Sequence, residues 1–168
     1  LLLKGIESTP AIDANGKKIN KPSSPGEYKK LPNHVLQADG TIHRYEEPIN
    51  IPAAMDELVS WINDNTDRAH PVTVSSIAHY NMVRIHPFDD GNGRGARFLM
   101  NLVLINQGLP PCVIKNENRQ EYIKSLTKAD KGDLQPFVEF CANSIKETQL
   151  TLLSDLQKES KSNGKGRG

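Results

Sequence analysis

The sequence is poor in cysteine and aromatic residues and has no long apolar run, so composition alone assigns it to no special class of protein. Of its 168 residues, two are cysteine, one is tryptophan and 5% are aromatic. Cys112 and Cys141 stand in no CxxC or His/Cys cluster, which excludes a zinc finger and favours two buried thiols, although one disulfide stays open. No apolar run approaches the ~20 residues that span a bilayer. The leucines at positions 1–3 are too few for a signal segment.

An excess of charge of one sign is also missing, because 21 basic residues stand against 20 acidic ones and the net charge is +1. This near-neutral balance argues against nucleic acid as the main partner. With 36% hydrophobic and 24% charged residues, the composition is that of an ordinary globular domain. We therefore expect no nucleic-acid and no membrane partner, and a cytoplasmic location. Since the first residue is not Met, we also expect the chain to be a piece of a longer protein.

The composition changes along the chain and predicts three regions. Residues 1–25 are rich in Pro, Gly, Ser and Lys without periodicity, which predicts an irregular arm or linker. Residues 26–157 carry the regular patterns of a folded domain, and residues 158–168 are rich in Ser, Lys and Gly, which predicts a flexible tail. Near the start of the domain, Asp39-Gly40 separates two β-prone runs at 33–36 and 41–45, which predicts a β-hairpin.

The rest of the domain has the spacing of amphipathic helices. Apolar residues recur every three or four positions in five segments. These segments are 51–62, 74–85, 98–105, 122–126 and 134–145, the last continuing as far as Leu156. Pro87 ends the second helix near residue 86, and the run Gly108–Pro111 ends the third. The sequence therefore predicts an all-α domain from which one hairpin projects.

The segment between the second and third helices, residues 86–97, reads HPFDDGNGRGAR and carries the chemistry. Its glycines allow tight turns, and it leads into a helix N-terminus, where free N–H groups and the helix dipole favour an anion. Arg94 and Arg97 lie three residues apart on one helical face and suit phosphate oxygens. Asp90 suits Mg²⁺, and His86 suits a base that takes a proton from a hydroxyl. These residue types together indicate phosphoryl or nucleotidyl transfer.

The same segment resembles a known family. It matches the Fic motif, H-x-F-x-[D/E]-G-N-G-R-x-x-R, at all eight specified positions, and it is neither a Walker loop nor a GxGxxG fingerprint. The likeness extends to residues 78–80, 98–101 and the break at 108–111, and covers about residues 26–153. The resemblance implies an all-α Fic-type helical bundle with a projecting β-hairpin flap. It also implies the transfer of AMP from ATP, with Mg²⁺, to a Ser, Thr or Tyr hydroxyl of a protein, with release of pyrophosphate.

The resemblance also implies roles for single residues. His86 would be the general base and Asp90 the Mg²⁺ ligand, Phe88 would anchor the loop in the core, and Asn92 and Arg94 would join His86 in catalysis. The residues that the resemblance implies for ATP binding are Val35, Gly91, Asn92, Gly93, Arg94, Gly95, Arg97, Tyr122 and Asp130. At Asp130 relatives often carry Asn. Asp89 occupies an unspecified position, and we expect it to be a solvated carboxylate.

The hairpin would act as the flap that aligns a target protein by strand-like pairing, with Asn33, His34 and Val35 contacting the target. The resemblance thus implies two partners, ATP and a protein substrate, which could be the chain itself. A homodimer stays open, since helical surfaces in this family often support one, but no stripe of residues here identifies an interface.

Many members of the family carry an inhibitory sequence, [S/T]-x-x-x-E-[G/N], whose Glu would pair with Arg97. The only Glu followed by Gly or Asn is Glu117, and four residues before it stands Val113 instead of Ser or Thr. The inhibitory sequence is therefore absent from these 168 residues. An upstream helix or a separate inhibitory protein would have to supply it, and we expect the chain without it to be unrestrained and to modify itself.

Other functions stay open on the sequence alone. The loop holds phosphates and not the base, so a Fic-type transferase of UMP, phosphocholine or a phosphate fits it equally well. A catalytically silent Fic-like module that binds a protein strand is a further alternative, although the His and Arg of the motif are intact. Binding of nucleic acid through the basic tail would show a steep salt dependence.

Overall fold

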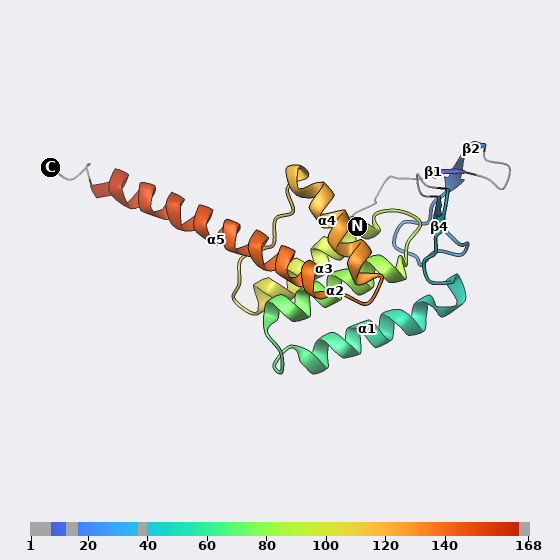
Figure 1. Ribbon diagram of the computed structural model, residues 1–168, viewed down its shortest axis with the longest axis horizontal. Helices are drawn as coiled ribbons and strands as arrows, with labels where there is room; N and C mark the ends of the chain where they lie inside the picture. The colour runs from blue at the N-terminus through green and yellow to red at the C-terminus, as the bar shows by residue number, and fades with distance from the viewer. Residues whose placement is uncertain (1–7, 13–16, 37–39, 165–168) are drawn as a thin grey trace. The chain divides into compact units, whose positions relative to one another are not determined.

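The computed structural model describes residues 8–12, 17–36 and 40–164, and the chain forms two compact units. The first unit comprises residues 1–68 and 78–99, and the second comprises residues 69–77 and 100–168. Five α-helices lie in the described residues (Figure 1). The all-α fold predicted from the sequence is confirmed. Among the same residues, none of the helices combines the length and apolar character that crossing a membrane requires.

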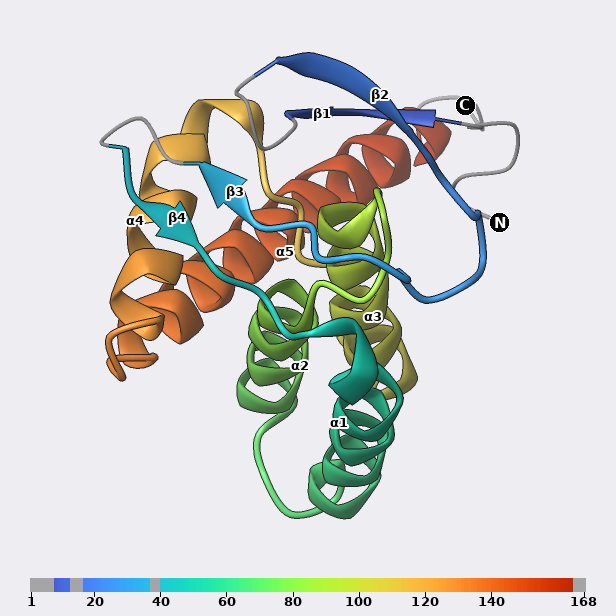
Figure 2. The same cartoon turned by 90° about the vertical axis from the view of Figure 1, so that its right-hand side faces the viewer.

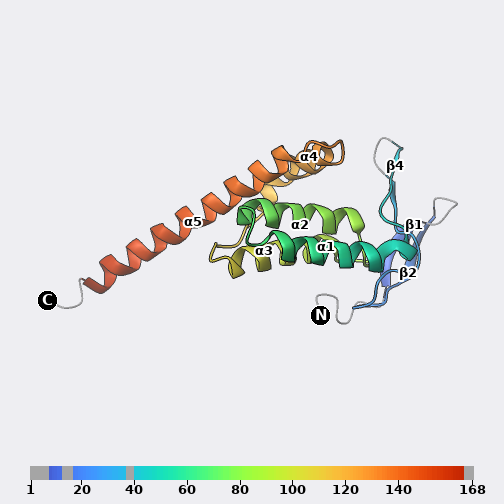
Figure 3. The same ribbon diagram turned by 90° about the horizontal axis from the view of Figure 1, so that it is seen from below.

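The first unit is built on three neighbouring helical segments (Figures 1 and 3). Helix α1 (Ile51–Asn65) follows a 3-10 turn at Pro48–Asn50 and lies beside the last part of α2 (Pro71–Ile85) and the first part of α3 (Asn92–Asn106). The approach of α3 to α2 is close, because a Cβ on Gly95 would lie 3.1 Å from Met82 Cε. The buried core of this unit consists of Ile51, Leu58, Met82, Ile85 and Ala96.

Two short hairpins complete the first unit (Figure 2). The predicted hairpin is confirmed: β3 (Val35–Leu36) pairs antiparallel with β4 (Ile42–His43), with Val35 opposite His43. Residues 37–39 of its predicted turn lie outside the described residues. The expectation of an irregular arm is wrong for residues 8–12 and 18–22, where β1 (Ser8–Ile12) pairs antiparallel with β2 (Lys18–Pro22). The two strands lack the alternation of apolar and polar residues that predicts a strand. Pro, Thr, Lys and Asn occupy positions where a half-buried strand would show apolar residues.

The second unit is built around α4 (Arg119–Ala129) and α5 (Gln135–Gly164), with a 3-10 turn at Asn116–Asn118 before α4. Tyr122 of α4 packs against Phe137 and Phe140 of α5, with ring centroids 6.1 and 6.0 Å apart. Figure 2 shows α4 lying across the first part of α5. Further buried residues of this unit are Val74, Met100, Val103, Leu104, Cys112, Leu126, Ala129, Cys141 and Ile145.

The two cysteines and the C-terminal helix of the second unit bear on earlier expectations. Cys112 and Cys141 are both buried and free, so the expectation of buried thiols is confirmed and the disulfide is excluded. The hydrogen bond with Cys141, together with burial, raises the pKa of Cys112. Helix α5 runs to Gly164, past Leu156 where we expected it to end, so residues 158–164 are helical where a flexible tail was predicted. Positions 165–168 lie outside the described residues.

Candidate active site

The segment that carries the Fic-like motif begins with a reversal of the chain at His86. The His86 N–H still donates to Met82 O, at 3.1 Å, and thereby closes the last turn of α2. The φ angle of His86 is +53°, and it is the only non-glycine residue with positive φ in the described part of the chain. The left-handed conformation is a common way to end a helix, and Pro87 disfavours the right-handed one at the residue before it. The reversal directs the chain away from α2 and toward the start of α3.

The imidazole of His86 is largely enclosed. Its ring stacks on the ring of Tyr45, with centroids 3.7 Å apart and planes inclined by 20°, and its Nδ1 lies 3.3 Å from Val83 O. Burial lowers the pKa of His86 to about 4, with smaller contributions in the same direction from Lys29 and His43. The ring is therefore neutral at pH 7, which is the form that accepts a proton.

The position of Nδ1 also assigns the tautomer. Val83 O can only accept, so Nδ1 carries the hydrogen and donates to it, and Nε2 keeps its lone pair. This assignment follows from the partner atom and not from observed hydrogens. The structure thus gives His86 one nitrogen that is free of a proton at neutral pH, as the role of general base requires.

Asn92 closes the loop from the other side. The residue is 3% exposed, and its Oδ1 accepts from Phe88 N–H at 2.9 Å while its Nδ2 donates to Phe88 O at 2.8 Å. The sequence placed Asn92 among the phosphate-binding and catalytic residues, and the structure shows its amide engaged by the loop backbone. Phe88 itself packs against the core of the first unit.

The start of α3 presents a site for an anion. Gly91 has φ +77°, a conformation that is strained for any side chain, and its O accepts the first α3 bond, from Gly95 N–H at 2.8 Å. The N–H groups of Asn92, Gly93 and Arg94 precede that bond and have no acceptor inside the helix. Together with the helix dipole they favour phosphate oxygens in front of the turn.

Charged side chains flank this turn. Arg94 Nη2 lies 3.3 Å from Asp90 Oδ2, and both side chains are more than two fifths exposed, so a ligand can reach them. The guanidinium of Arg97 lies close to the turn, since a Cβ on Gly93 would be 3.5 Å from Arg97 Nη1. The two arginines and Asp90 therefore offer both signs of charge to a metal-bound phosphate chain.

Asp90 is the residue of the loop that suits a metal ion. In the residues that the structure describes, no group of three or more His, Cys, Asp and Glu side chains could hold an ion alone. Mg²⁺ is commonly bound by one or two carboxylates together with substrate phosphates. The single exposed carboxylate of Asp90, next to the anion site of α3, fits a Mg²⁺ that arrives with a nucleotide.

One expectation about the loop is wrong. Asp89 is not a solvated carboxylate: its side chain is 10% exposed and its Oδ1 lies 2.8 Å from Lys21 Nζ of β2. The sequence could not show this pair, because Lys21 lies 68 residues earlier in a segment without periodicity. The ion pair attaches the β1–β2 hairpin to the motif.

The flap residues divide into two groups. Val35 is 46% exposed and open to a partner. His34 is engaged inside the flap, since its Nδ1 accepts from Tyr45 N–H at 3.2 Å and its Nε2 lies 3.4 Å from Glu47 Oε1. Asn33 donates from Nδ2 to Phe88 O at 2.8 Å, which holds the flap against the loop. For His34 and Asn33 the structure thus shows contacts within the first unit.

Sequence reasoning missed two residues that contact the motif. Lys29 is 2% exposed, and its backbone N–H donates to Pro87 O at 2.8 Å while its Nζ donates to Asn33 Oδ1 at 2.7 Å. Burial lowers the pKa of Lys29, an effect that Glu47 and Glu46 partly offset. Tyr45, the second residue, covers the His86 ring. Only the place of Tyr45 at the end of the predicted hairpin could have drawn attention to it.

The two residues predicted to contact adenine and ribose belong to the second unit. Tyr122 is part of the aromatic contact between α4 and α5, and Asp130 follows the last residue of α4, where its N–H donates to Leu126 O at 2.9 Å. Both stay predictions.

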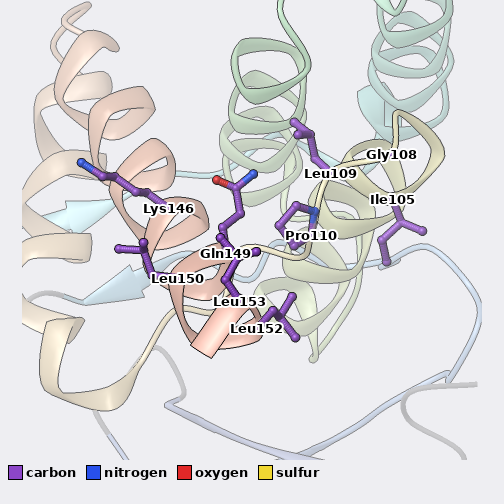
Figure 4. A pocket seen from close by; sticks show the side chains of 9 residues that line it. All are labelled: Ile105, Gly108, Leu109, Pro110, Lys146, Gln149, Leu150, Leu152 and Leu153. Atoms are coloured by element: carbon purple, nitrogen blue, oxygen red, sulfur yellow. The ribbon is translucent and has the colours of Figure 1, made fainter. Parts of the chain in front are cut away.

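The second unit also has an apolar groove of about 850 Å³ between the end of α3 with its following loop and α5 (Figure 4). It is lined by Ile105, Gly108, Leu109, Pro110, Lys146, Gln149, Leu150, Leu152 and Leu153. Lys146 is its one charged residue, so the groove offers no acid–base pair.

Comparison with known proteins identifies the loop and its surroundings. The family model of the Fic/DOC family matches residues 9–104. The protein adenylyltransferase Fic of Drosophila grimshawi is 39% identical over 116 residues, which are 67% of this chain and 24% of that protein. The match to the family begins within β1, so it includes the hairpin that we had assigned to an arm.

Solved structures are similar as well. A Fic domain containing signaling protein from Bacteroides thetaiotaomicron has a TM-score of 0.70 and 38% identity, covering 74% of this chain and 53% of its own. Fic-1 of C. elegans has a TM-score of 0.58 and 40% identity, covering 63% and 32%. The chain spans about a quarter of the length of the curated relatives that it matches.

Proposed function

The chain belongs to the Fic/DOC family, and from this membership together with the loop geometry we propose that it transfers AMP from ATP to a hydroxyl of a protein. The observation that carries the proposal is the neutral imidazole of His86, with Nε2 free of a proton, beside a helix N-terminus built for phosphate. A base and an anion site are the two parts that nucleotidyl transfer to a hydroxyl requires. The curated relatives are named protein adenylyltransferases.

The proposed reaction is a displacement at the α-phosphorus of ATP. The hydroxyl oxygen of the target forms a bond to the α-phosphorus, and its proton passes to Nε2 of His86. The bond from the α-phosphorus to the oxygen that bridges to the β-phosphate breaks, and pyrophosphate leaves with the electron pair. His86 is suited to this step because its Nδ1–H is held by Val83 O.

Binding of the triphosphate falls to the start of α3. The N–H groups of Asn92, Gly93 and Arg94 would contact phosphate oxygens, and the Arg94 and Arg97 guanidinium groups would bind the outer phosphates in a bidentate manner. Asp90 would hold the Mg²⁺, which, when bound, neutralises charge that develops on the phosphate chain. Asn92 would act through the loop, because its amide holds Phe88.

The target protein would dock on the flap. The hairpin β3–β4 consists of two paired residues on each strand, and Val35 and Ile42 are about half exposed. An extended target segment that adds to such an edge gains main-chain hydrogen bonds without requiring a particular sequence. A hydroxyl on that segment would then be carried toward His86.

The proposal is tested with ATP labelled at either end of the triphosphate. Incubation with α-³²P ATP, Mg²⁺ and a cell lysate should label proteins, whereas γ-³²P ATP should add no label beyond the kinase background of the lysate without the chain, because AMP is transferred. His86→Ala should reduce the labelling at least ~10²-fold, the usual effect of removing a general base. His70→Ala removes an exposed imidazole just before α2 and is the matched control.

The same reaction tests the alternatives and the lack of an inhibitory sequence. Label from γ-³²P ATP above the lysate background would instead indicate phosphoryl transfer, and label from UTP or CDP-choline alone would indicate one of the other transfers. Since no [S/T]-x-x-x-E-[G/N] sequence occurs in the chain, we expect intact-mass measurement to show AMP on the protein itself. Absence of label from every donor would contradict the proposed enzyme and favour a protein-binding module.

A further inference from the structure

We propose that Tyr45 is a positioning residue for His86, and that its ring transmits the conformation of the flap to the general base. The inference rests on the proposed function, since it concerns the base of that reaction. The two rings lie face to face at 3.7 Å with an inclination of 20°, although 41 residues separate them in the chain. This contact is the most direct connection between the flap and a residue of the motif that is expected to react.

His86 needs such support from outside its own segment. The bond from Nδ1 to Val83 O, at 3.3 Å, is longer than the usual N–H···O distance and constrains the ring weakly by itself. The residue also has φ +53°, a conformation that persists in non-glycine residues when the surrounding structure holds it. Tyr45 supplies a flat apolar surface against the imidazole face, which limits rotation of the ring and keeps Nδ1 toward Val83.

Tyr45 is itself held by the flap. Its N–H donates to His34 Nδ1 at 3.2 Å, and His34 Nε2 lies 3.4 Å from Glu47 Oε1. On the other side of its ring, His43 makes an edge contact with a centroid distance of 4.7 Å, and Lys29 Nζ lies 6.0 Å from the centroid. Residues from both sides of the hairpin therefore fix the Tyr45 ring.

The arrangement predicts which kinetic constant responds to Tyr45. Its ring stacks on the imidazole of the base itself. Tyr45→Ala should therefore lower kcat about tenfold, the upper end of what an aromatic pair contributes, while KM for ATP stays within about twofold. Tyr45→Phe keeps the stacked ring and should retain wild-type kcat.

A matched control is available in the same unit. Tyr28 has a ring of the same size and contacts Phe88 of the loop, with centroids 5.8 Å apart. Tyr28→Ala removes an aromatic side chain from the loop's surroundings without uncovering the imidazole. A kcat effect in Tyr45→Ala that Tyr28→Ala reproduces would overturn the proposal, because it would indicate general loosening of the loop.

A second measurement does not depend on activity. NMR of protein with ¹⁵N-labelled histidine reports the tautomer and titration of His86, assigned by the signal lost in His86→Gln. The groups facing this ring are Lys29, His43 and Asp90, and all are retained in the Tyr45 variants. In the wild type, Nδ1 should carry the proton and the ring should not become an imidazolium above pH 6. In Tyr45→Ala the ring should show both tautomers and should become protonated at a higher pH than in the wild type.

The outcomes separate the two proposals. Unchanged ring signals together with unchanged kcat in Tyr45→Ala would refute the positioning role. Wild-type protein that transfers no AMP, yet shows the expected shift of ring signals, would refute the proposed function and leave the contact between Tyr45 and His86 supported. If Tyr45→Ala does not fold, Tyr45→Leu, which keeps an apolar side chain but lacks the flat ring, should show the same changes to a smaller extent.

Discussion

At the scale of single residues, the loop is held in shape by polar side chains that bond its backbone. Asn92 satisfies both backbone groups of Phe88, and Asn33 adds a second donor to Phe88 O. Buried backbone groups without partners cost free energy, so these amides keep Phe88 and the turn in one conformation. Asn92 thus holds the turn at the start of α3 through the backbone of Phe88.

This arrangement predicts a loss of stability in Asn92→Ala. The substitution leaves the part-buried Phe88 N–H without the Asn92 acceptor, and we expect the free energy of unfolding to fall by about 2 kcal/mol. Denaturant titration followed by circular dichroism measures it. Asn65→Ala is the control, because Asn65 makes one such bond, from Nδ2 to Trp61 O at the end of α1, and should cost less. Equal losses in both variants would contradict the bracing role of Asn92.

At the scale of elements, the β1–β2 hairpin and the motif are joined by a nearly buried ion pair. The side chains of Lys21 and Asp89 are 19% and 10% exposed, and their charged atoms lie 2.8 Å apart. Removing one partner of such a pair leaves the other charge partly desolvated, which costs more than the pair contributes. The hairpin should therefore separate from the loop when Lys21 is lost.

Lys21→Ala should accordingly lower the free energy of unfolding by about 2 kcal/mol. It should also raise the rate of amide hydrogen exchange in residues 17–22 and in residues 86–91 together. Hydrogen exchange read by mass spectrometry measures both segments. Lys30→Ala is matched to it, since Lys30 pairs with Glu27 at the same distance of 2.8 Å while both side chains stay well exposed. Exposed pairs contribute little, so that variant should leave exchange unchanged. Faster exchange in the hairpin alone would show that it does not brace the loop.

At the scale of the whole molecule, two buried histidines connect the site to the stability of the fold. His79 is fully buried in α2, and burial together with Arg97 lowers its pKa to about 4. His86 is lowered to about 4 as well, chiefly by burial. Both stay neutral in the folded chain at pH values where the unfolded chain binds protons, because the ordinary histidine pKa is 6.5.

The direction in which stability changes with pH follows from which state binds more protons. Between pH 6.5 and about 4 the unfolded state binds more protons than the folded state. The free energy of unfolding therefore keeps its full value above pH 6.5 and falls as the pH drops toward 4. Each histidine should contribute on the order of 3 kcal/mol to this loss. Urea unfolding at pH 7.5 and pH 5 measures it, and His86→Gln should show a smaller difference than wild type. An identical pH dependence in the variant would contradict the burial of His86 as its cause.

The sequence by itself determined the chemistry of the loop and the positions of the helices. Apolar spacing and the proline and glycine breaks are local signals, and the motif places a base, a carboxylate and two arginines within twelve consecutive residues. Only the tertiary structure decided which distant residues complete the loop. Lys21 on Asp89, Asn33 on Phe88 and Tyr45 on His86 join segments with no shared pattern. The protonated nitrogen of His86 depends likewise on where Val83 O and the Tyr45 ring come to lie, because burial and hydrogen-bond partners exist only once the chain is folded.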